Sequence, residues 1–94
     1  MPAKRPYIIL DAQDNVATAI LALQAGETIQ TDRGDITLTQ AIAYGHKFAL
    51  QNIRQGDYVV KYGAQIGRAI TAISAGEHVH VHNVEDVVDE VRKK

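Results

Sequence analysis

Three of the four histidines in this 94-residue chain lie in one short stretch, at positions 78, 80 and 82, with a valine between each pair. If this stretch is a strand, alternate side chains face opposite sides, so His78, His80 and His82 share one face while Val79 and Val81 pack on a core. Imidazoles about 7 Å apart can act as metal ligands, proton carriers or hydrogen-bond partners of an anionic substrate. The alternative interpretation is a solvated row of histidines without a function.

Two further pairs of polar residues each lie beside a glycine. His46 and Lys47 follow Gly45, and Lys61 and Tyr62 precede Gly63. The first pair could contact a substrate carboxylate or supply an acid, and the structural alternative is a turn histidine beside a surface lysine. The structural alternative for the second pair is an exposed lysine and a half-buried tyrosine.

The composition favours strands as the elements that position these residues. Hydrophobic residues make up 46% of the chain, but the aromatic ones are only four tyrosines and one phenylalanine. The core must therefore consist of Val, Ile, Leu and Ala, of which the β-branched residues favour strands. A chain of this length forms one domain, residues 1–94, and is commonly stabilised further by a partner.

The charge and the missing residue types exclude several classes of function. Ten basic and eleven acidic residues give a net charge of −1, so we expect no nucleic-acid or membrane binding. The chain has no cysteine, which excludes disulfides, thiolate nucleophiles and iron-sulfur ligands. No signal peptide or transmembrane stretch is recognisable, and a cytoplasmic location is the expectation.

Short apolar segments separated by turn residues predict the strands. Residues 7–10 form one such segment, and residues 16–23 form another, for which a helix is the alternative. Residues 28–31 and 36–39 flank the turn 32–35 and together predict a hairpin.

A repeated pattern predicts three tight corners. An apolar residue, two others, a glycine, an acid, any residue and a β-branched residue follow one another around Gly26, Gly56 and Gly76. Each glycine would supply a positive φ, and the acid would accept a hydrogen bond from the turn. Gly63 and Gly67 should mark a further turn and a bulge or close backbone approach. The expected product is a bent, all-β fold.

The end of the chain changes to helical periodicity. Valines at 84, 87, 88 and 91 recur at helical spacing, with acids on the other face and basic residues at the end. With Asn83 as the N-cap, the pattern predicts a short amphipathic helix over about 84–92.

Five ordered motifs over residues 7–83 resemble the amino-terminal SAF-type domain of the altronate dehydratase family. These motifs are Asp14-Asn15-Val16-Ala17, Gly45-His46-Lys47-Phe48-Ala49-Leu50, Val60-Lys61-Tyr62-Gly63, Ile66-Gly67 and the stretch from Gly76 to Asn83. Five motifs in a fixed order are far more specific than any one of them. The resemblance implies a mostly-β, SAF-like β-clip fold with long bent hairpins, and an enzyme group that eliminates water from sugar acids.

The resemblance also implies partners, a cofactor and site residues. In the family the SAF-like domain precedes a much larger catalytic portion, so this chain is expected to be a small subunit or an excised domain that completes a shared active site on a sugar acid. A divalent metal, Fe²⁺ or alternatively Mn²⁺, is expected, with most ligands on the larger chain. The site residues it implies are His46, Lys47 and His80 for catalysis, Lys61, Tyr62 and Asn83 for substrate binding, and His78 and His82 for the metal.

Other functions stay open at this point. The small subunit of sulfolactate sulfo-lyase is similar too, and it would eliminate sulfite instead of water. A non-catalytic SAF-type carbohydrate-binding or assembly module is a further alternative, and an independent metal-binding protein would rest on the histidine row alone. Self-association of the chain is also open, and the sequence does not specify the acid that is used.

Overall fold

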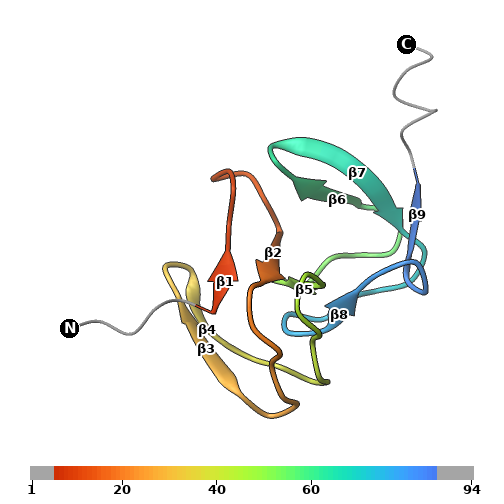
Figure 1. The fold of residues 1–94 in the computed structure, drawn as a ribbon. Helices are drawn as coiled ribbons and strands as arrows, with labels where there is room; N and C mark the ends of the chain where they lie inside the picture. The colour runs from red at the N-terminus through yellow and green to blue at the C-terminus, as the bar shows by residue number, and fades with distance from the viewer. Residues whose placement is uncertain (1–5, 87–94) are drawn as a thin grey trace.

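The computed structural model describes residues 6–86, and all regular elements in that range are short strands (Figure 1). The strands are β1 (Tyr7–Ile8), β2 (Val16–Ala19), β3 (Thr28–Thr31), β4 (Gly34–Thr37), β5 (Lys47–Ala49), β6 (Tyr58–Lys61), β7 (Ala64–Ala69), β8 (His78–Val79) and β9 (Val84–Asp86). The mostly-β prediction is confirmed, including the strand at Val16–Ala19 and the hairpin formed by β3 and β4. Within residues 6–86 no helix is long and apolar enough to cross a membrane.

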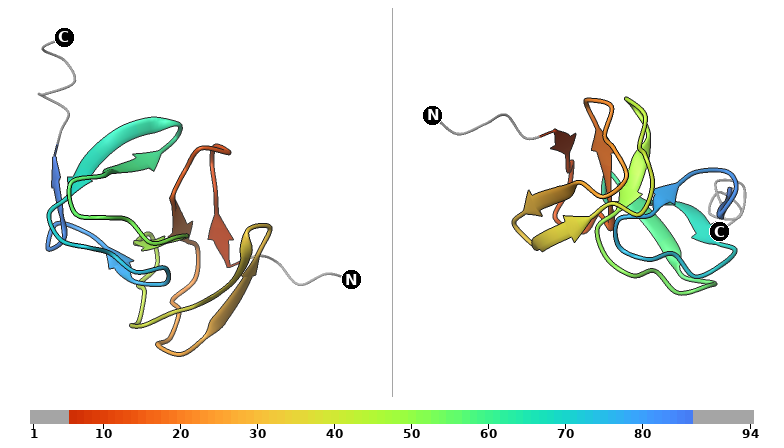
Figure 2. Two further views of the ribbon diagram at one scale, coloured as in Figure 1. Left: turned by 180° about the vertical axis from the view of Figure 1, so that it is seen from behind. Right: turned by 90° about the horizontal axis from the view of Figure 1, so that it is seen from below.

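A four-stranded antiparallel sheet divides the molecule. Its strand order is β1-β2-β5-β8, so β2 and β5 are central and β8 is an edge. The β3–β4 hairpin lies on one side of this sheet, and the three-stranded sheet β6-β7-β9 lies on the other (Figures 1 and 2).

Alternation along the central strands produces two hydrophobic cores. Ala17 of β2 and Phe48 of β5 face the core that includes the β3–β4 hairpin, where the Tyr7 and Phe48 rings meet edge to face at 6.3 Å. Val16 and Ala49, one position away, face the second core with β6 and β7. Because successive residues of a strand point to opposite faces, one strand pair supports both cores.

The predicted corners are present, and the structure adds a fourth. Gly26, Gly56 and Gly76 have φ angles of 87°, 91° and 88°, and Gly45 has 82°. At the fourth corner His46 stands where the other corners have an acid. Glutamates at two of the corners accept a hydrogen bond from the backbone three residues earlier, as predicted, whereas the imidazole of His46 is left to make other contacts.

The backbone hydrogen bonds of these corners occur twice. In each half of the chain, residues before two corners exchange two backbone hydrogen bonds. The end of a hairpin donates to the carbonyl oxygen of the residue after a corner glycine. The next corner glycine donates to a carbonyl oxygen of the central sheet. The pairs are Leu23–Ile42 and Ile53–Ile73, Leu38–Glu27 and Ala69–Asp57, and Gly45–Ala19 and Gly76–Ala49. The second member of each pair lies about 30 residues after the first.

The predicted helix is wrong at its start. Val84–Asp86 forms strand β9 and pairs with β7, with Val84 packed on the second core. The β7 edge supplies backbone partners to this segment, and this tertiary pairing overrides the helical periodicity. The rest of the predicted helix, 87–92, lies outside the described residues. Gly67 allows this close approach, because a Cβ there would collide with Val84 and the Glu85 carbonyl oxygen.

The corner glycines at 56 and 76 make a matched pair for a stability test. A Cβ on Gly56 would meet nothing, so Gly56→Ala should cost only the positive-φ strain, about 1 to 2 kcal/mol in the free energy of unfolding. A Cβ on Gly76 would also collide with the Thr37 carbonyl oxygen, so Gly76→Ala should cost clearly more. Denaturant unfolding of both variants measures this, and equal midpoints would contradict the close packing at Gly76.

Candidate functional site

Three segments bring the four histidines together at the β8 edge of the central sheet. His46 immediately precedes β5, His78 begins β8, and His80 and His82 lie in the turn between β8 and β9. The β5–β8 register pairs Phe48 with His78, which places the beginning of β5 beside the end of β8. Histidines 32 to 36 positions apart in sequence therefore become neighbours.

The imidazoles are in mutual contact and form what we call the histidine cluster, His46, His78, His80 and His82. Nδ1 of His46 lies 2.9 Å from Nε2 of His78. Ring centroids are 5.0 Å apart for His46 and His78, 4.9 Å for His46 and His80, and 5.3 Å for His78 and His82. The prediction that three of these histidines share a face agrees with these contacts, and His46 joins them from another strand.

The strand predicted across the histidine stretch is shorter than expected. It ends at Val79, and residues 81–83 form a turn, so Val81 is 78% exposed and the prediction that it packs in the core is wrong. Val79 is fully buried, as predicted. The strand ends here because the backbone N–H of His80 donates to the side-chain oxygen of Asn83 at 2.9 Å instead of to a neighbouring strand.

Asn83 fixes this turn through hydrogen bonds of its side chain. Its side chain is buried, and its amide nitrogen donates to the carbonyl oxygen of His78 at 2.7 Å and to Glu77 at 3.4 Å. Both polar atoms of its side chain are hydrogen-bonded, so Asn83 positions the backbone of His78 and His80. The substrate-binding role of Asn83 stays a prediction, and the contacts of its side chain show that it holds the backbone of His78 and His80.

Lys47 and Lys61 place positive charge beside the cluster. Burial, together with the nearby Lys61 ammonium group, lowers the pKa of Lys47. Neither lysine has a carboxylate ion-pair partner within residues 6–86. The ion pair found in that range joins Arg68 and Glu85 at 3.8 Å. Two neighbouring ammonium groups without an ion pair in the described residues favour an anion between them.

Tyr62 forms the turn of the β6–β7 hairpin. It is 63% exposed and is the one non-glycine residue within 6–86 with a positive φ, 59°. The Lys61 ammonium lies 4.8 Å from the centre of its ring. The neighbouring Gly63 N–H donates to the buried carboxylate of Asp14 at 2.9 Å, which ties the turn to the loop before β2. This fixed, strained turn presents Lys61 and Tyr62 on the same side of the molecule as Lys47.

A cavity of about 230 Å³ adjoins the histidine cluster. Lys47 and His80 line it together with apolar side chains from four strands, and Glu85 and Asp86 of β9 complete its rim. Sequence reasoning missed these two acids as site residues because it placed them on a helix. No alternation of apolar and polar residues marks Val84–Asp86, so the sequence carries no local signal for this strand.

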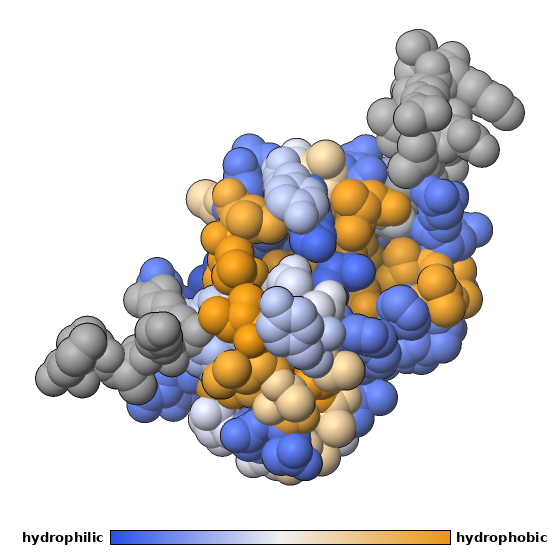
Figure 3. Space-filling view, viewed as in Figure 1, coloured by the Kyte–Doolittle hydropathy of each residue, from blue (hydrophilic) through white to orange (hydrophobic). Residues whose placement is uncertain are grey.

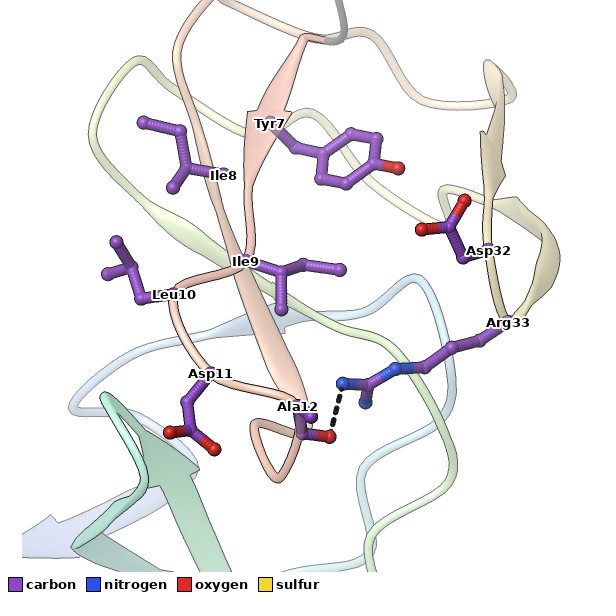
Figure 4. A pocket seen from close by; sticks show the side chains of 8 residues that line it. All are labelled: Tyr7, Ile8, Ile9, Leu10, Asp11, Ala12, Asp32 and Arg33. Carbon is purple, nitrogen blue, oxygen red and sulfur yellow. Dashed lines mark hydrogen bonds between the residues drawn. The ribbon is translucent and has the colours of Figure 1, made fainter.

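A larger hollow, about 630 Å³, lies elsewhere, and none of the predicted site residues line it. Figure 4 shows it between the segment Tyr7–Ala12 and the turn of the β3–β4 hairpin. Arg33 of that turn donates to the carbonyl oxygens of Ala12, at 2.8 Å, and of Asp14. These bonds tie the hairpin to the loop, and the hollow offers apolar walls without converging catalytic groups.

The histidine cluster fits a divalent metal ion. One nitrogen each from His46, His78 and His80 lie within 4.8 Å of one another. Metal–nitrogen bonds of about 2.1 Å place two ligand nitrogens about 3 to 3.4 Å apart, close to the His46–His78 separation. Two imidazole nitrogens at 2.9 Å require a proton or a cation between them, since two lone pairs would repel. These three histidines differ from the predicted ligands, His78 and His82, because the nitrogens that lie close to that of His78 belong to His46 and His80.

Comparison with known proteins identifies the group to which the fold and cluster belong. Residues 5–87 match the family model described as the altronate/galactarate dehydratase SAF domain. Over 77 residues the chain is 49% identical to altronate dehydratase of Escherichia coli, covering 82% of this chain, and over 88 residues it is 40% identical to that of Bacillus subtilis, covering 94%. The chain spans only 16% and 18% of these two enzymes.

A third relative has nearly the same length as this chain. It is the (2R)-sulfolactate sulfo-lyase subunit alpha of Chromohalobacter salexigens, 35% identical over 86 residues, which cover 84% of this chain and 92% of that subunit. By name, therefore, the relatives are dehydratases and a subunit of a lyase.

The crowding of the cluster generates a pH prediction. Burial, then the neighbouring His46, His82, His80 and Lys47, lower the pKa of His78 below its ordinary value of 6.5. As the pH falls through 6.5, the unfolded chain takes up a proton at His78 that the folded chain resists, so stability should decrease.

His78→Asn should make this loss of stability with falling pH shallower. Urea unfolding of both proteins between pH 8 and pH 5 measures the slope, and the difference at pH 8 isolates the packing cost of the substitution. Parallel pH profiles would contradict the assignment to His78.

Proposed function

Because this chain belongs to the altronate/galactarate dehydratase SAF domain family, we propose that it is the small component of a sugar-acid dehydratase. In this proposal it completes an active site with a larger catalytic chain. The observation that carries the proposal is the convergence of His46, His78 and His80 beside Lys47, since nitrogen donors and ammonium groups gather there without a carboxylate in the cluster. Acidic ligands and the remaining catalytic groups would come from the larger chain, in the cytoplasm.

The reaction requires a base, an acid and a site for the substrate carboxylate. Elimination of water removes the proton next to the carboxylate, forms a carbon–carbon double bond from its electron pair, and releases the β-hydroxyl group with a proton from an acid. Lys47 and Lys61 can bind the carboxylate, because their ammonium groups lie close together without an acidic partner within residues 6–86. His80 is exposed at the edge of the adjoining cavity, where its imidazole can take or give a proton.

His46 and His78 would hold a divalent ion, with His80 beside them as the acid or base. A bound Fe²⁺ or Mn²⁺ would supply a Lewis acid that polarises the carboxylate or the departing hydroxyl group. Nitrogen ligands suit such ions, and the open positions are left for oxygen ligands from substrate and partner. Asn83 keeps two of the three rings in place through the backbone of His78 and His80. Tyr62, presented by the β6–β7 turn beside Lys61, would contact the hydroxylated end of the acid.

Elimination of sulfite from a sulfonated acid is the second candidate. It is favoured by one observation, that a sulfo-lyase subunit alpha matches this chain over nearly all of that subunit's length. The same lysines would then bind a dianionic substrate. Assays with both altronate and sulfolactate decide between the two reactions.

The metal site makes a prediction for the isolated chain. Zn²⁺, whose coordination has no electronic preference for geometry, is a suitable probe. His46→Ala should weaken Zn²⁺ binding by about tenfold or more because it removes one of three converging nitrogens, whereas His82→Ala should change it little. Titration calorimetry compares the two variants, and equal losses would show that the ligands have been misassigned.

The activity prediction concerns the assembled enzyme. The chain alone should not dehydrate altronate, and activity should appear when a large dehydratase chain from the same genome is added. His80→Ala should then reduce kcat by about 100-fold with little change in stability, as loss of an acid, base or ligand would.

Val79→Ala is the matched control for that variant, because it removes buried methyl groups beside the same turn. It should lower the free energy of unfolding by about 1 to 3 kcal/mol and leave kcat of the folded enzyme nearly unchanged. Full activity of the chain alone, or parental kcat in His80→Ala, would reject the proposed function.

A further inference from the structure

The cavity beside the histidine cluster has an apolar floor that the proposed chemistry does not use. We call it the valine cavity, because Val59, Val79, Val81 and Val84 line it together with Ile66. Val59 and Val79 are fully buried, while Ile66 and Val84 are partly exposed into the cavity. A polyhydroxylated acid would lose hydrogen bonds with water on such walls without replacing them, so the floor does not suit the substrate.

Val81 extends this apolar surface outward. It is 78% exposed, and the turn that carries it is already fixed by the bonds of Asn83, so the fold does not need a valine there. Figure 3 shows hydrophobic side chains beside the β8–β9 turn, separated by hydrophilic ones from a second hydrophobic area over β1. A cavity with an apolar floor and an exposed apolar side chain at its rim has the form of a socket for a protein side chain.

Charged side chains surround the apolar floor of the valine cavity. Lys47 and His80 lie on the side shared with the histidine cluster, and Glu85 and Asp86 lie on β9. Glu85 already lies 3.8 Å from the guanidinium group of Arg68, so the apolar floor is the feature that selects the occupant, and an apolar side chain would fill it. It would also bring its own chain directly beside His80 and Lys47.

The relatives indicate which chain that is. The region matched in the altronate dehydratases is their amino-terminal part and only 16% to 18% of their length. In those enzymes the remaining polypeptide follows the matched region, whose counterpart here ends directly after β9. β9 is one wall of the valine cavity, so the larger part of such an enzyme begins at this edge.

We propose that the valine cavity is the socket in which the larger dehydratase chain docks, through an apolar side chain that enters it. This inference rests on the proposed function, because it names the surface by which the two chains meet. Docking here places the groups of the larger chain against the histidine cluster without using any of the cluster's ligands.

Val81→Asp tests the socket, because the residue is exposed and its loss should not affect folding. Leu21→Asp is the matched control, since Leu21 is also a large exposed apolar residue, 57% exposed, but lies outside the cavity. The probe is the large dehydratase-like chain from the same genome, titrated with each variant by calorimetry. We expect Val81→Asp to raise Kd by about tenfold or more and Leu21→Asp to change it by less than about twofold. At saturating large chain, Val81→Asp should regain the parental kcat.

Each outcome decides one of the two proposals. Parental Kd for Val81→Asp, or an equal loss for Leu21→Asp, would overturn the socket while leaving the two-chain enzyme intact. Weakened binding of Val81→Asp to a large chain that shows no lyase activity would support the socket and reject the proposed reaction. If the parental chain does not bind the large chain, both proposals fail.

Discussion

The pairing of β2 with β5 is the constraint on which the rest of the structure depends. These two short strands have no polar face, because one set of alternating side chains enters the core beneath β3 and β4 and the other set enters the core beneath β6 and β7. Both hairpins therefore pack on the same strand pair, and neither core can form without it. The polar residues of β5 are displaced to its first positions, where His46 and Lys47 meet the short edge strand β8.

The chemistry of the site follows from what gathers at that edge. Four imidazoles and two ammonium groups lie together while the cluster itself contains no carboxylate, although the whole chain carries one more acidic than basic residue. Charge is thus segregated within a nearly neutral molecule. Burial and the neighbouring imidazoles lower the pKa of His78, and the neutral imidazole this favours is the form that binds metals and accepts protons. This edge therefore offers ammonium groups to an anion and imidazole nitrogens to a metal cation.

Local patterns predicted the strands and corners well, because glycine positions and β-branched alternation act over a few residues. The hairpin at Thr28–Thr37 and the positive φ at Gly26, Gly56 and Gly76 follow from such signals. The contact of His46 with His78 could not be predicted from spacing, since it depends on the register of β5 with β8. The fourth corner was missed because His46 and Phe48 replace the acid and the β-branched residue of the pattern. At the end of the chain, pairing with β7 decided the structure of Val84–Asp86 against a helical periodicity.

The double occurrence of the corner bonds has an evolutionary consequence. Repetition of reciprocal corner bonds, hairpin closure and attachment to the central sheet is what duplication and fusion of a unit of about 30 residues would leave. Two separate copies of such a unit could have formed the same two cores as a symmetric dimer. The two units differ at one equivalent corner. Glu77, after Gly76, bonds to its own turn, whereas His46, after Gly45, leaves its turn without such a bond and contacts His78.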